Sequence, residues 1–423
     1  MSDPTGRLTG MRTPWRTSRR SPEDDPSVVF AHAVGAARQQ DVPVEVLDAL
    51  TTALAGLSPD LDLPEVPGSL ADAVTTLYGR GWQPADVAHV ARRRLSQRAG
   101  KLAAAVVTAE ASSSGAARRA PREWVDQLDA LGTTTGLPGW WRSTGVEPAT
   151  AWRDVVRLLA LLLQLPAMEQ LLPTPAGWPQ HRVEGAAVPA GPVDEKVLGR
   201  VRGLLAKAER TEFPEEADAL TAKAQQLMSR HAIDAAVLAD RRPAGAEAGV
   251  VARRLHLDDP YAEPKAHLLQ AVATANGARV VLLPDLGIAT VVGQPVDLEL
   301  VDLLFTSLLL QATRALADAS RGESAHTRAA VFRRGFLYSY ATRVGERLTE
   351  AREQATREAA GEYGSALVPV LARREEAVAE RVEELFPRLR VRRGRTVDPA
   401  GWYAGRQAAD RADLGSGRSP LRG

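Results

Sequence analysis

The sequence predicts a mostly α-helical protein with a small α+β domain, and three observations support this. From Ser27 to about Leu172, apolar residues recur at the three- and four-residue spacing of amphipathic helices. Two further stripes within residues 194–240 predict a helical hairpin. Two short runs rich in β-branched and aliphatic residues, at 279–284 and 288–293, are separated by Asp285-Leu286-Gly287 and predict a short antiparallel β-hairpin packed with helices.

The composition excludes several classes of protein. The chain of 423 residues contains no cysteine, which rules out disulfides, thiolate nucleophiles and cysteine-ligated metal sites. Its hydrophobic content of 44% and charged content of 25% are ordinary for a globular protein. The formal net charge of +1 argues against a uniformly basic nucleic-acid binder.

The charge is distributed unevenly along the chain. Residues 1–20 carry a net charge of +4 and residues 387–423 carry +6, which leaves −9 for residues 21–386. A mildly acidic body with two basic ends is the first indication of function, because basic segments of this kind often contact nucleic acid.

The elements follow in order. Residues 1–26 are polar, rich in arginine and predicted to be a disordered basic arm. Residues 27–172 are predicted to form a helical N-terminal domain, whose tryptophans we interpret as core anchors. Residues 173–193 hold five prolines and three glycines and are therefore predicted to be a linker.

Residues 194–240 form the predicted helical hairpin. Its first apolar stripe contains Leu198, Val201 and Leu205, and the second runs from Ala217 to His231. Between them Thr211 is a suitable N-cap and Pro214 suits a first helical turn. A unit of this size buries little apolar surface alone, so it needs a partner, either the neighbouring domain or another molecule.

The hairpin resembles a known family. The motifs are Leu-Leu-Ala-Lys-Ala-Glu at 204–209, Phe-Pro-Glu-Glu-Ala at 213–217 and Ala-Lys-Ala-Gln-Gln-Leu-Met at 222–228. Over about 194–236 these are similar to the domain-of-unknown-function family numbered 2786, and the segment at about 255–350 resembles the uncharacterised domain that often accompanies it. The resemblance implies an architecture and no reaction.

Residues 250–365 are predicted to be the small α+β domain, and residues 366–423 a helix followed by a basic tail. Helices are expected from about Pro264 to Asn276 and from about Val296 to Ser320. A third carries Phe332, Phe336 and Tyr340 on one face. The most apolar run, Leu158–Leu163, is far shorter than the roughly 20 residues of a membrane span, so we expect a cytoplasmic protein with no membrane partner.

The first candidate nucleic-acid site has the pattern of a helix-turn-helix. A helix ending at Tyr78 is followed by Gly79-Arg80-Gly81 and then by a basic second helix. In this interpretation Arg92, Arg93 and Arg94 would contact phosphates, and the residues near Pro84–Ala88 would face bases. The alternative is an ordinary corner between two packed helices.

The second candidate is the C-terminal tail. Its arginines would attract phosphates and its two adjacent aromatic residues would stack on unpaired bases. The alternative is a solubilising tail whose aromatic residues dock on the body. The candidate residues are Arg388, Arg390, Arg392, Arg393, Arg395, Trp402 and Tyr403.

A weaker candidate is a metal site formed by His256, Asp258, Asp259 and His267. Histidine and carboxylate can bind zinc or manganese without cysteine, but no His-Glu-x-x-His spacing fixes two ligands on one helical face. The alternative is a loop whose carboxylates cap the next helix. No phosphate-binding glycine motif or nucleophile elbow is present, so we expect no cofactor.

These observations leave three hypotheses open. The first is a non-enzymatic protein that binds DNA or RNA or has a regulatory binding role. The second is a protein–protein scaffold that offers the stripe Leu198–Leu205 to a partner. The third is a metal-dependent enzyme using the histidines and aspartates around residue 258.

Overall fold

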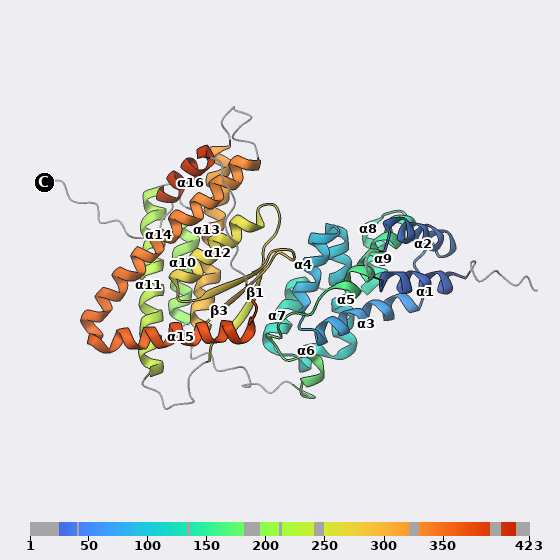
Figure 1. Cartoon of the computed structure of the whole chain (residues 1–423), viewed down its shortest axis with the longest axis horizontal. Helices are drawn as coiled ribbons and strands as arrows, with labels where there is room; N and C mark the ends of the chain where they lie inside the picture. Colours follow the sequence, from blue (N-terminus) through green and yellow to red (C-terminus); the bar gives the residue numbers. More distant parts are fainter. Residues whose placement is uncertain are drawn as a thin grey trace, which may run out of the picture.

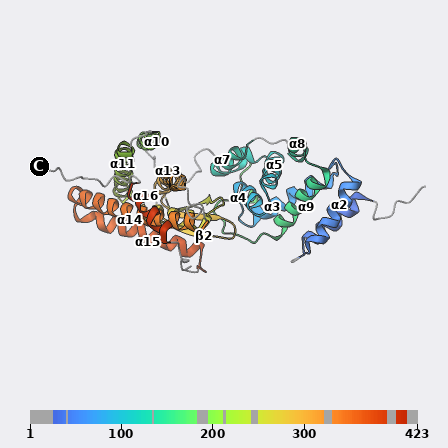
Figure 2. The same cartoon turned by 90° about the horizontal axis from the view of Figure 1, so that it is seen from above.

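The structure, a computed structural model, describes residues 25–39, 42–132, 136–181, 195–210, 214–240, 249–320, 330–389 and 399–411. The predicted basic arm lies outside these residues, except for its last two positions. The chain forms two bodies that lie side by side along the long axis of the molecule (Figures 1 and 2). The predicted fold class, mostly α with a small α+β part, is confirmed.

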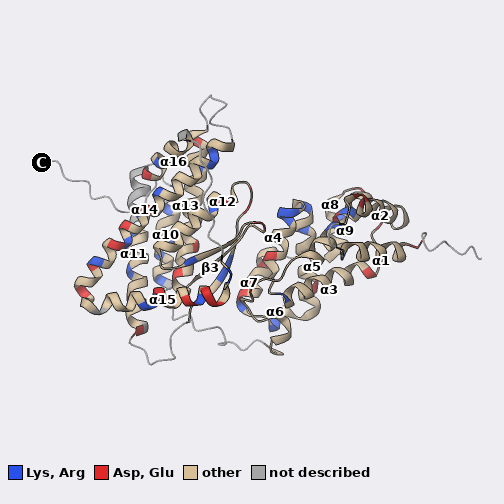
Figure 3. Ribbon diagram, viewed as in Figure 1, with Lys and Arg blue, Asp and Glu red and all other residues tan. Residues whose placement is uncertain are grey.

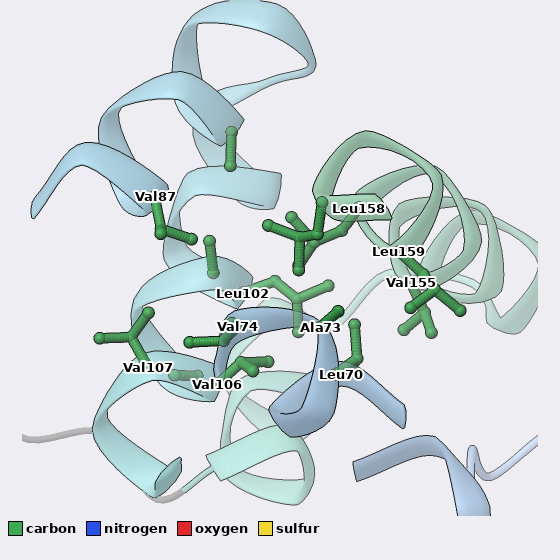
Figure 4. Packing of buried hydrophobic residues seen from close by; sticks show 14 of the residues in the cluster. Leu70, Ala73, Val74, Val87, Leu102, Val106, Val107, Val155, Leu158 and Leu159 are labelled. Atoms are coloured by element: carbon green, nitrogen blue, oxygen red, sulfur yellow. The ribbon is translucent and has the colours of Figure 1, made fainter. Parts of the chain in front are cut away.

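The N-terminal body is entirely helical. Its helices pack Leu, Val and Ala side chains into one core, part of which is shown in Figure 4. Trp82, Trp124 and Trp152 are fully buried there, as expected for core anchors. The helices are α1 (Pro26–Ala37), α2 (Val44–Leu57), α3 (Glu65–Gly79), α4 (Pro84–Arg94), α5 (Gln97–Ser114), α6 (Ala116–Arg119), α7 (Arg122–Leu131), α8 (Gly136–Thr144) and α9 (Pro148–Gln164).

The first part of the predicted linker is attached to this body. A short 3-10 helix, η2 (Pro175–Gly177), leads to Trp178, which is buried against the edge of Trp124 at 5.1 Å between ring centroids. The backbone carbonyls of Trp178 and Pro179 accept hydrogen bonds from Arg119. The rest of the predicted linker, residues 182–193, lies outside the described residues.

The second body contains a three-stranded antiparallel sheet among helices. The strand order is β1-β3-β2, and the predicted β-hairpin is its β2–β3 pair, with Arg279 opposite Val292. Strand β1 was not predicted from the sequence. The elements are α10 (Glu195–Ala208), α11 (Pro214–Asp240), β1 (Val251–His256), α12 (Ala262–Ala275), β2 (Arg279–Leu283), β3 (Ile288–Gly293), α13 (Pro295–Ala319), α14 (Ala330–Tyr363), η3 (Gly364–Ala366), α15 (Leu367–Leu385) and α16 (Pro399–Arg411).

The helical hairpin α10–α11 has its partner inside the chain. Leu198, Val201 and Leu205 are buried in the same apolar cluster as residues of α12, α13, α14 and α16. One hydrophobic core therefore contains residues from three of the predicted units, 194–240, 250–365 and 366–423. This stripe is not available to a second molecule, which removes the surface on which the scaffold hypothesis was based.

Helix α13 is the one described helix that is long and apolar enough to cross a membrane by length and composition. A helix was expected here, from about Val296 to Ser320, as part of the α+β domain. Its Leu298, Val301 and Leu304 are buried in the core of the second body, as in the central helix of a compact domain.

Helix α16 packs unusually closely on α14. The residues Gly401 and Gly405 face the backbone of α14, and a Cβ at either position would clash with the carbonyl oxygen of Phe332 or Phe336. Ala408 and Ala409 complete the contact in the core, and the Arg347 guanidinium donates to the carbonyl of Ala409. The predicted basic tail is thus in part a core helix.

We predict that Gly405→Ala destabilises the protein by about 2 kcal/mol or more, because the added methyl group must push α16 away from α14. Chemical denaturation measures the loss. The matched control is Gly361→Ala on the open side of α14, where a Cβ meets no atom within 4 Å. Because alanine favours helix, that variant should be neutral or up to about 1 kcal/mol more stable. Equal effects of the two variants would contradict the close packing.

Candidate functional site

The α3–α4 corner follows from its sequence. Gly81 has φ of 88°, a conformation that favours glycine, and a Cβ there would clash with the backbone carbonyl of Met168. Pro84 occupies the first turn of α4, and the Asp86 side chain accepts a hydrogen bond from the Gln83 N–H in a capping box. The corner predicted from residues 70–95 is present.

The second helix of this corner is not free to enter a groove of DNA. In α4, Pro84, Asp86, Val87 and Ala88 are buried, and so are His89, Val90 and Ala91. The tip of the β2–β3 hairpin adds Leu286 and Ile288 to the core of the N-terminal body. The expectation that residues near Pro84–Ala88 face bases is therefore wrong, because Pro84, Asp86, Val87 and Ala88 are buried inside the protein.

Asp86 is the centre of a polar cluster between the two bodies. One carboxylate oxygen accepts from the Arg254 guanidinium at 2.5 Å, and the other lies 2.8 Å from the Nε2 atom of His256. Burial opposes ionisation of Asp86, but the charge of Arg254 and the hydrogen bond from His256 outweigh it, so the pKa lies below its usual value. The group is a buried carboxylate.

Arg254 on β1 is almost completely enclosed, with 3% of its side chain exposed. Besides Asp86, it donates to the carbonyl oxygen of Gly81 at 2.8 Å and to that of Glu169 at 2.6 Å. It therefore fastens the sheet to the α3–α4 corner and to the segment after α9. A buried ion pair is tolerated when both partners are hydrogen-bonded in this way.

His89 is a neutral imidazole in this cluster. Its Nδ1 atom accepts from Arg92 at 3.2 Å, so the proton lies on Nε2, which donates to the Leu286 carbonyl at 3.1 Å. The ring centroid lies 4.8 Å from that of His256. Burial, reinforced by His256, lowers the pKa of His89 from 6.5 to about 4.

Two of the predicted phosphate-binding arginines are occupied inside the molecule. Arg92 pairs with Asp258 at 2.5 Å, and Arg93 pairs with Asp259. The structure thus joins two sequence candidates, since the arginines of α4 neutralise the carboxylates proposed as metal ligands. Arg94 is exposed at the end of α4, where Figure 3 shows the blue turn.

The predicted metal candidates do not form a ligand set. Within the described residues, no group of three or more histidines and carboxylates is arranged to hold a metal ion. His256 and Asp258 face α4, whereas the Nε2 atom of His267 lies 3.1 Å from the Thr342 hydroxyl on α14. Nothing in the geometry favours the metal-enzyme hypothesis.

The C-terminal candidates are divided between two environments. Arg388 is exposed after α15, whereas Arg390, Arg392, Arg393 and Arg395 lie outside the described residues. In α16, Trp402 is half-buried and Tyr403 is 66% exposed. The aromatic pair therefore belongs to a helix docked on the body, in which Trp402 is partly covered and Tyr403 faces solvent.

A basic helix face that the sequence analysis missed lies on α10. Between residues 196 and 210 there are five basic residues and one acidic residue. Lys196, Arg200 and Lys207 are exposed and share one side of the helix with Gly203, and the exposed Arg210 continues this line just after the helix ends. We call these four basic residues the α10 basic face. The spacing of 4, 3, 4 and 3 across 196, 200, 203, 207 and 210 was visible in the sequence.

The α10 basic face points away from the core. Leu198, Val201 and Leu205 occupy the opposite side of α10 and are buried. Figure 2 shows α10 and α11 along one edge of the second body. The guanidinium groups of Arg200 and Arg210 form no ion pair within the described part of the chain, whereas Arg202 lies beside Glu299 at 4.0 Å.

Comparison with known proteins finds a family to which the α10–α11 hairpin is similar. Residues 196–235 match the family described as Protein of unknown function (DUF2786), which confirms the resemblance of the hairpin. This match does not extend to the companion domain suggested for residues 255–350. No curated protein and no solved structure matches the chain.

The polar cluster predicts a pH dependence of stability. His89 is held neutral in the fold with a pKa of about 4, whereas the unfolded chain binds its proton near 6.5. The stability that neutral His89 contributes to the fold is therefore complete above about pH 6.5 and is lost as the pH falls toward 4. We expect the wild type to lose about 2 kcal/mol more than His89→Gln between pH 7 and pH 5 in denaturant titrations.

The control for this experiment is His32→Gln, because His32 is exposed on α1. That variant should follow the wild-type pH profile. A His89→Gln profile parallel to the wild type would show that His89 is not held neutral.

Proposed function

We propose that this protein is a non-enzymatic nucleic-acid-binding protein that contacts backbone phosphates through the α10 basic face. The observation that carries the proposal is the exposure of Lys196, Arg200, Lys207 and Arg210 along one line, at and just beyond a helix whose other side is buried. Arginine and lysine attract phosphates, and binding is favoured by the release of counterions.

The dimensions of the face suit a phosphate backbone. A helix rises 1.5 Å per residue, so Lys196 and Lys207 are separated by roughly 16 Å along the axis, which is several phosphates of one strand. Gly203 lies between Arg200 and Lys207, and no atom lies within 4 Å of the position of a Cβ there. A strand can therefore approach the helix closely between its cations.

The buried core of the hairpin holds this face in position. Leu198, Val201 and Leu205 anchor α10 to the second body, and the guanidinium of Arg314 donates to the Glu209 carbonyl at 2.9 Å at the end of the hairpin's first helix. The cations are thus presented from a fixed helix. Contacts of this type position a nucleic acid without reading its sequence.

The proposal is tested with the fourfold variant Lys196→Ala, Arg200→Ala, Lys207→Ala and Arg210→Ala. Electrophoretic mobility of labelled DNA and RNA, single- and double-stranded, is measured across a salt series. We expect the full chain to shift at least one of these, and the variant to bind on the order of tenfold or more weakly with a shallower salt dependence, because each lost phosphate contact lowers the slope by about one.

The matched control removes four exposed basic residues from the N-terminal body: Arg38, Lys101, Arg118 and Arg142. Both variants change the net charge by the same amount, so the comparison separates position from charge. Absence of any shift at low salt would overturn the proposal. Equal weakening by the two variants would remove the α10 basic face from it.

The tail is tested separately, by Arg390→Ala, Arg392→Ala, Arg393→Ala and Arg395→Ala together. A deletion of 388–423 is unsuitable because it removes α16 and its buried Ala408 and Ala409. We expect the fourfold variant to keep the wild-type unfolding temperature and to bind nucleic acid more weakly at low salt. Unchanged affinity and salt slope would show that the tail does not contact the ligand.

A further inference from the structure

Helix α2 lies at the end of the N-terminal body that is farthest from the second body (Figures 1 and 2). One side of this helix packs against α1 and α9, and its Leu54 is buried there. The other side faces solvent. A surface helix normally presents charged and polar residues on its solvent side, with its apolar residues turned toward the core.

The solvent side of α2 carries an apolar row instead. Four residues at spacings of 4, 3 and 4 form it, and we call them the α2 stripe: Val46, Leu50, Ala53 and Leu57. Val46 is 43% exposed and Leu57 is 36% exposed, while Ala53 is exposed and Leu50 is half-buried. The exposed Ala49 and Gly56 lie beside the row, and their small size lets another segment approach closely.

The surroundings of the α2 stripe are acidic. Residues 25–79 contain eight acidic residues and one arginine, a net charge of −7. Asp48 is paired with arginines of α9, but Glu45, Asp60 and Glu65 are exposed and form no ion pair with any described residue. The last turn of α2 holds no basic residue, although the helix dipole favours one there. This surface therefore repels a second copy of itself and attracts a basic segment with apolar side chains.

The chain itself contains a segment of this chemistry. Residues 1–20, which we call the arm segment, lie outside the described residues and carry a net charge of +4. Three large apolar side chains lie among its arginines, at Leu8, Met11 and Trp15. The arm segment thus combines the positive charge and the apolar groups that complement the α2 stripe.

The arm segment is attached close to one end of the α2 stripe. Helix α1 begins at Pro26, and Phe30, one turn later, packs on Trp152 with 6.2 Å between ring centroids. The Trp152 indole N–H donates at 2.6 Å to the carbonyl of Ser58, the residue that follows α2. The chain therefore enters α1 near Leu57. At 1.5 Å per residue the stripe is roughly 17 Å long, and the 20 residues of the arm segment span about 30 Å even at that rise.

We propose that the arm segment binds the α2 stripe of its own chain, with Leu8, Met11 and Trp15 covering the apolar row. Burial of apolar surface supplies the affinity, and the charges set the orientation. In this arrangement Arg19 and Arg20, which are nearest the attachment point, lie closest to the C-terminus of α2. The inference goes beyond the proposed function and does not depend on the α10 basic face.

The test uses a spin label on the arm segment, because a chain without cysteine can be labelled at a single introduced position. Thr13→Cys is labelled in the full-length protein, and its electron paramagnetic resonance spectrum is recorded. We expect an immobilised component that is unchanged on tenfold dilution. With Val46→Ser and Leu57→Ser together, the ratio of immobilised to mobile label should fall on the order of tenfold, because the apolar contacts are lost.

The matched control is Val44→Ser. Val44 is 54% exposed on the same helix but lies roughly 160° around its axis from Val46, so this variant should keep the wild-type spectrum. A change in the arm segment avoids any effect on the folding of α2. Leu8→Ser and Trp15→Ser together should release the label by a similar factor, with the unfolding temperature unchanged.

A mobile label in the wild-type protein would overturn the proposal. An immobilised label that neither the α2 variant nor the arm variant releases would do so as well, because the arm segment would then bind elsewhere. Loss of the immobilised component on dilution would show that a second copy supplies the arm, which contradicts binding within one chain. None of these outcomes bears on the α10 basic face, whose mobility-shift variants retain the arm segment.

Discussion

The arrangement of the two bodies depends on the buried ion pair between Asp86 and Arg254. Asp86 is fixed by the first turn of α4, and Arg254 by its place on β1 opposite Thr290 of β3. Because neither charge reaches water, each must stay bonded to the other, and removal of one partner of such a pair typically costs about 3–5 kcal/mol. The pair sets the position of the sheet against the α3–α4 corner, so that Asp258 and Asp259, which follow β1, meet the arginines of α4.

The sequence contains two similar clusters of basic residues, on α4 and on α10, and the structure gives them different environments. Arg92 and Arg93 end a helix with a basic last turn, but their charges are neutralised across the contact between the bodies. On α10 the hydrophobic residues face inward and the cations face outward. There the guanidinium groups of Arg200 and Arg210 form no ion pair with any described residue. A basic cluster therefore indicates nucleic-acid binding only when its own fold does not supply the counter-charge.

Local chemistry explains which parts of the fold could be predicted. The β2–β3 pair is specified by its aliphatic and β-branched runs and by the turn at Asp285-Leu286-Gly287, so its prediction is confirmed. Strand β1 was missed because Arg253 and Arg254 interrupt its apolar pattern. The partners that make burial of Arg254 favourable are distant in the chain, and the charged one, Asp86, is 168 residues away. The placement of Leu286 and Ile288 in the core of the N-terminal body has the same long-range origin. The α10 basic face could have been found, because helical periodicity applies to cations as it does to apolar residues.

The close contact of Gly401 and Gly405 in α16 with the backbone of α14 has a consequence for synthesis of the chain. The α14 surface around Phe332 and Phe336 is closed by a helix that emerges from the ribosome after every other element of the second body. Until residues 399–411 have left the exit tunnel, the nascent body presents an incomplete core. If a ribosome stalls between α15 and α16, the apolar surface of α14 that α16 normally covers stays exposed. Chaperones recognise surfaces of this kind.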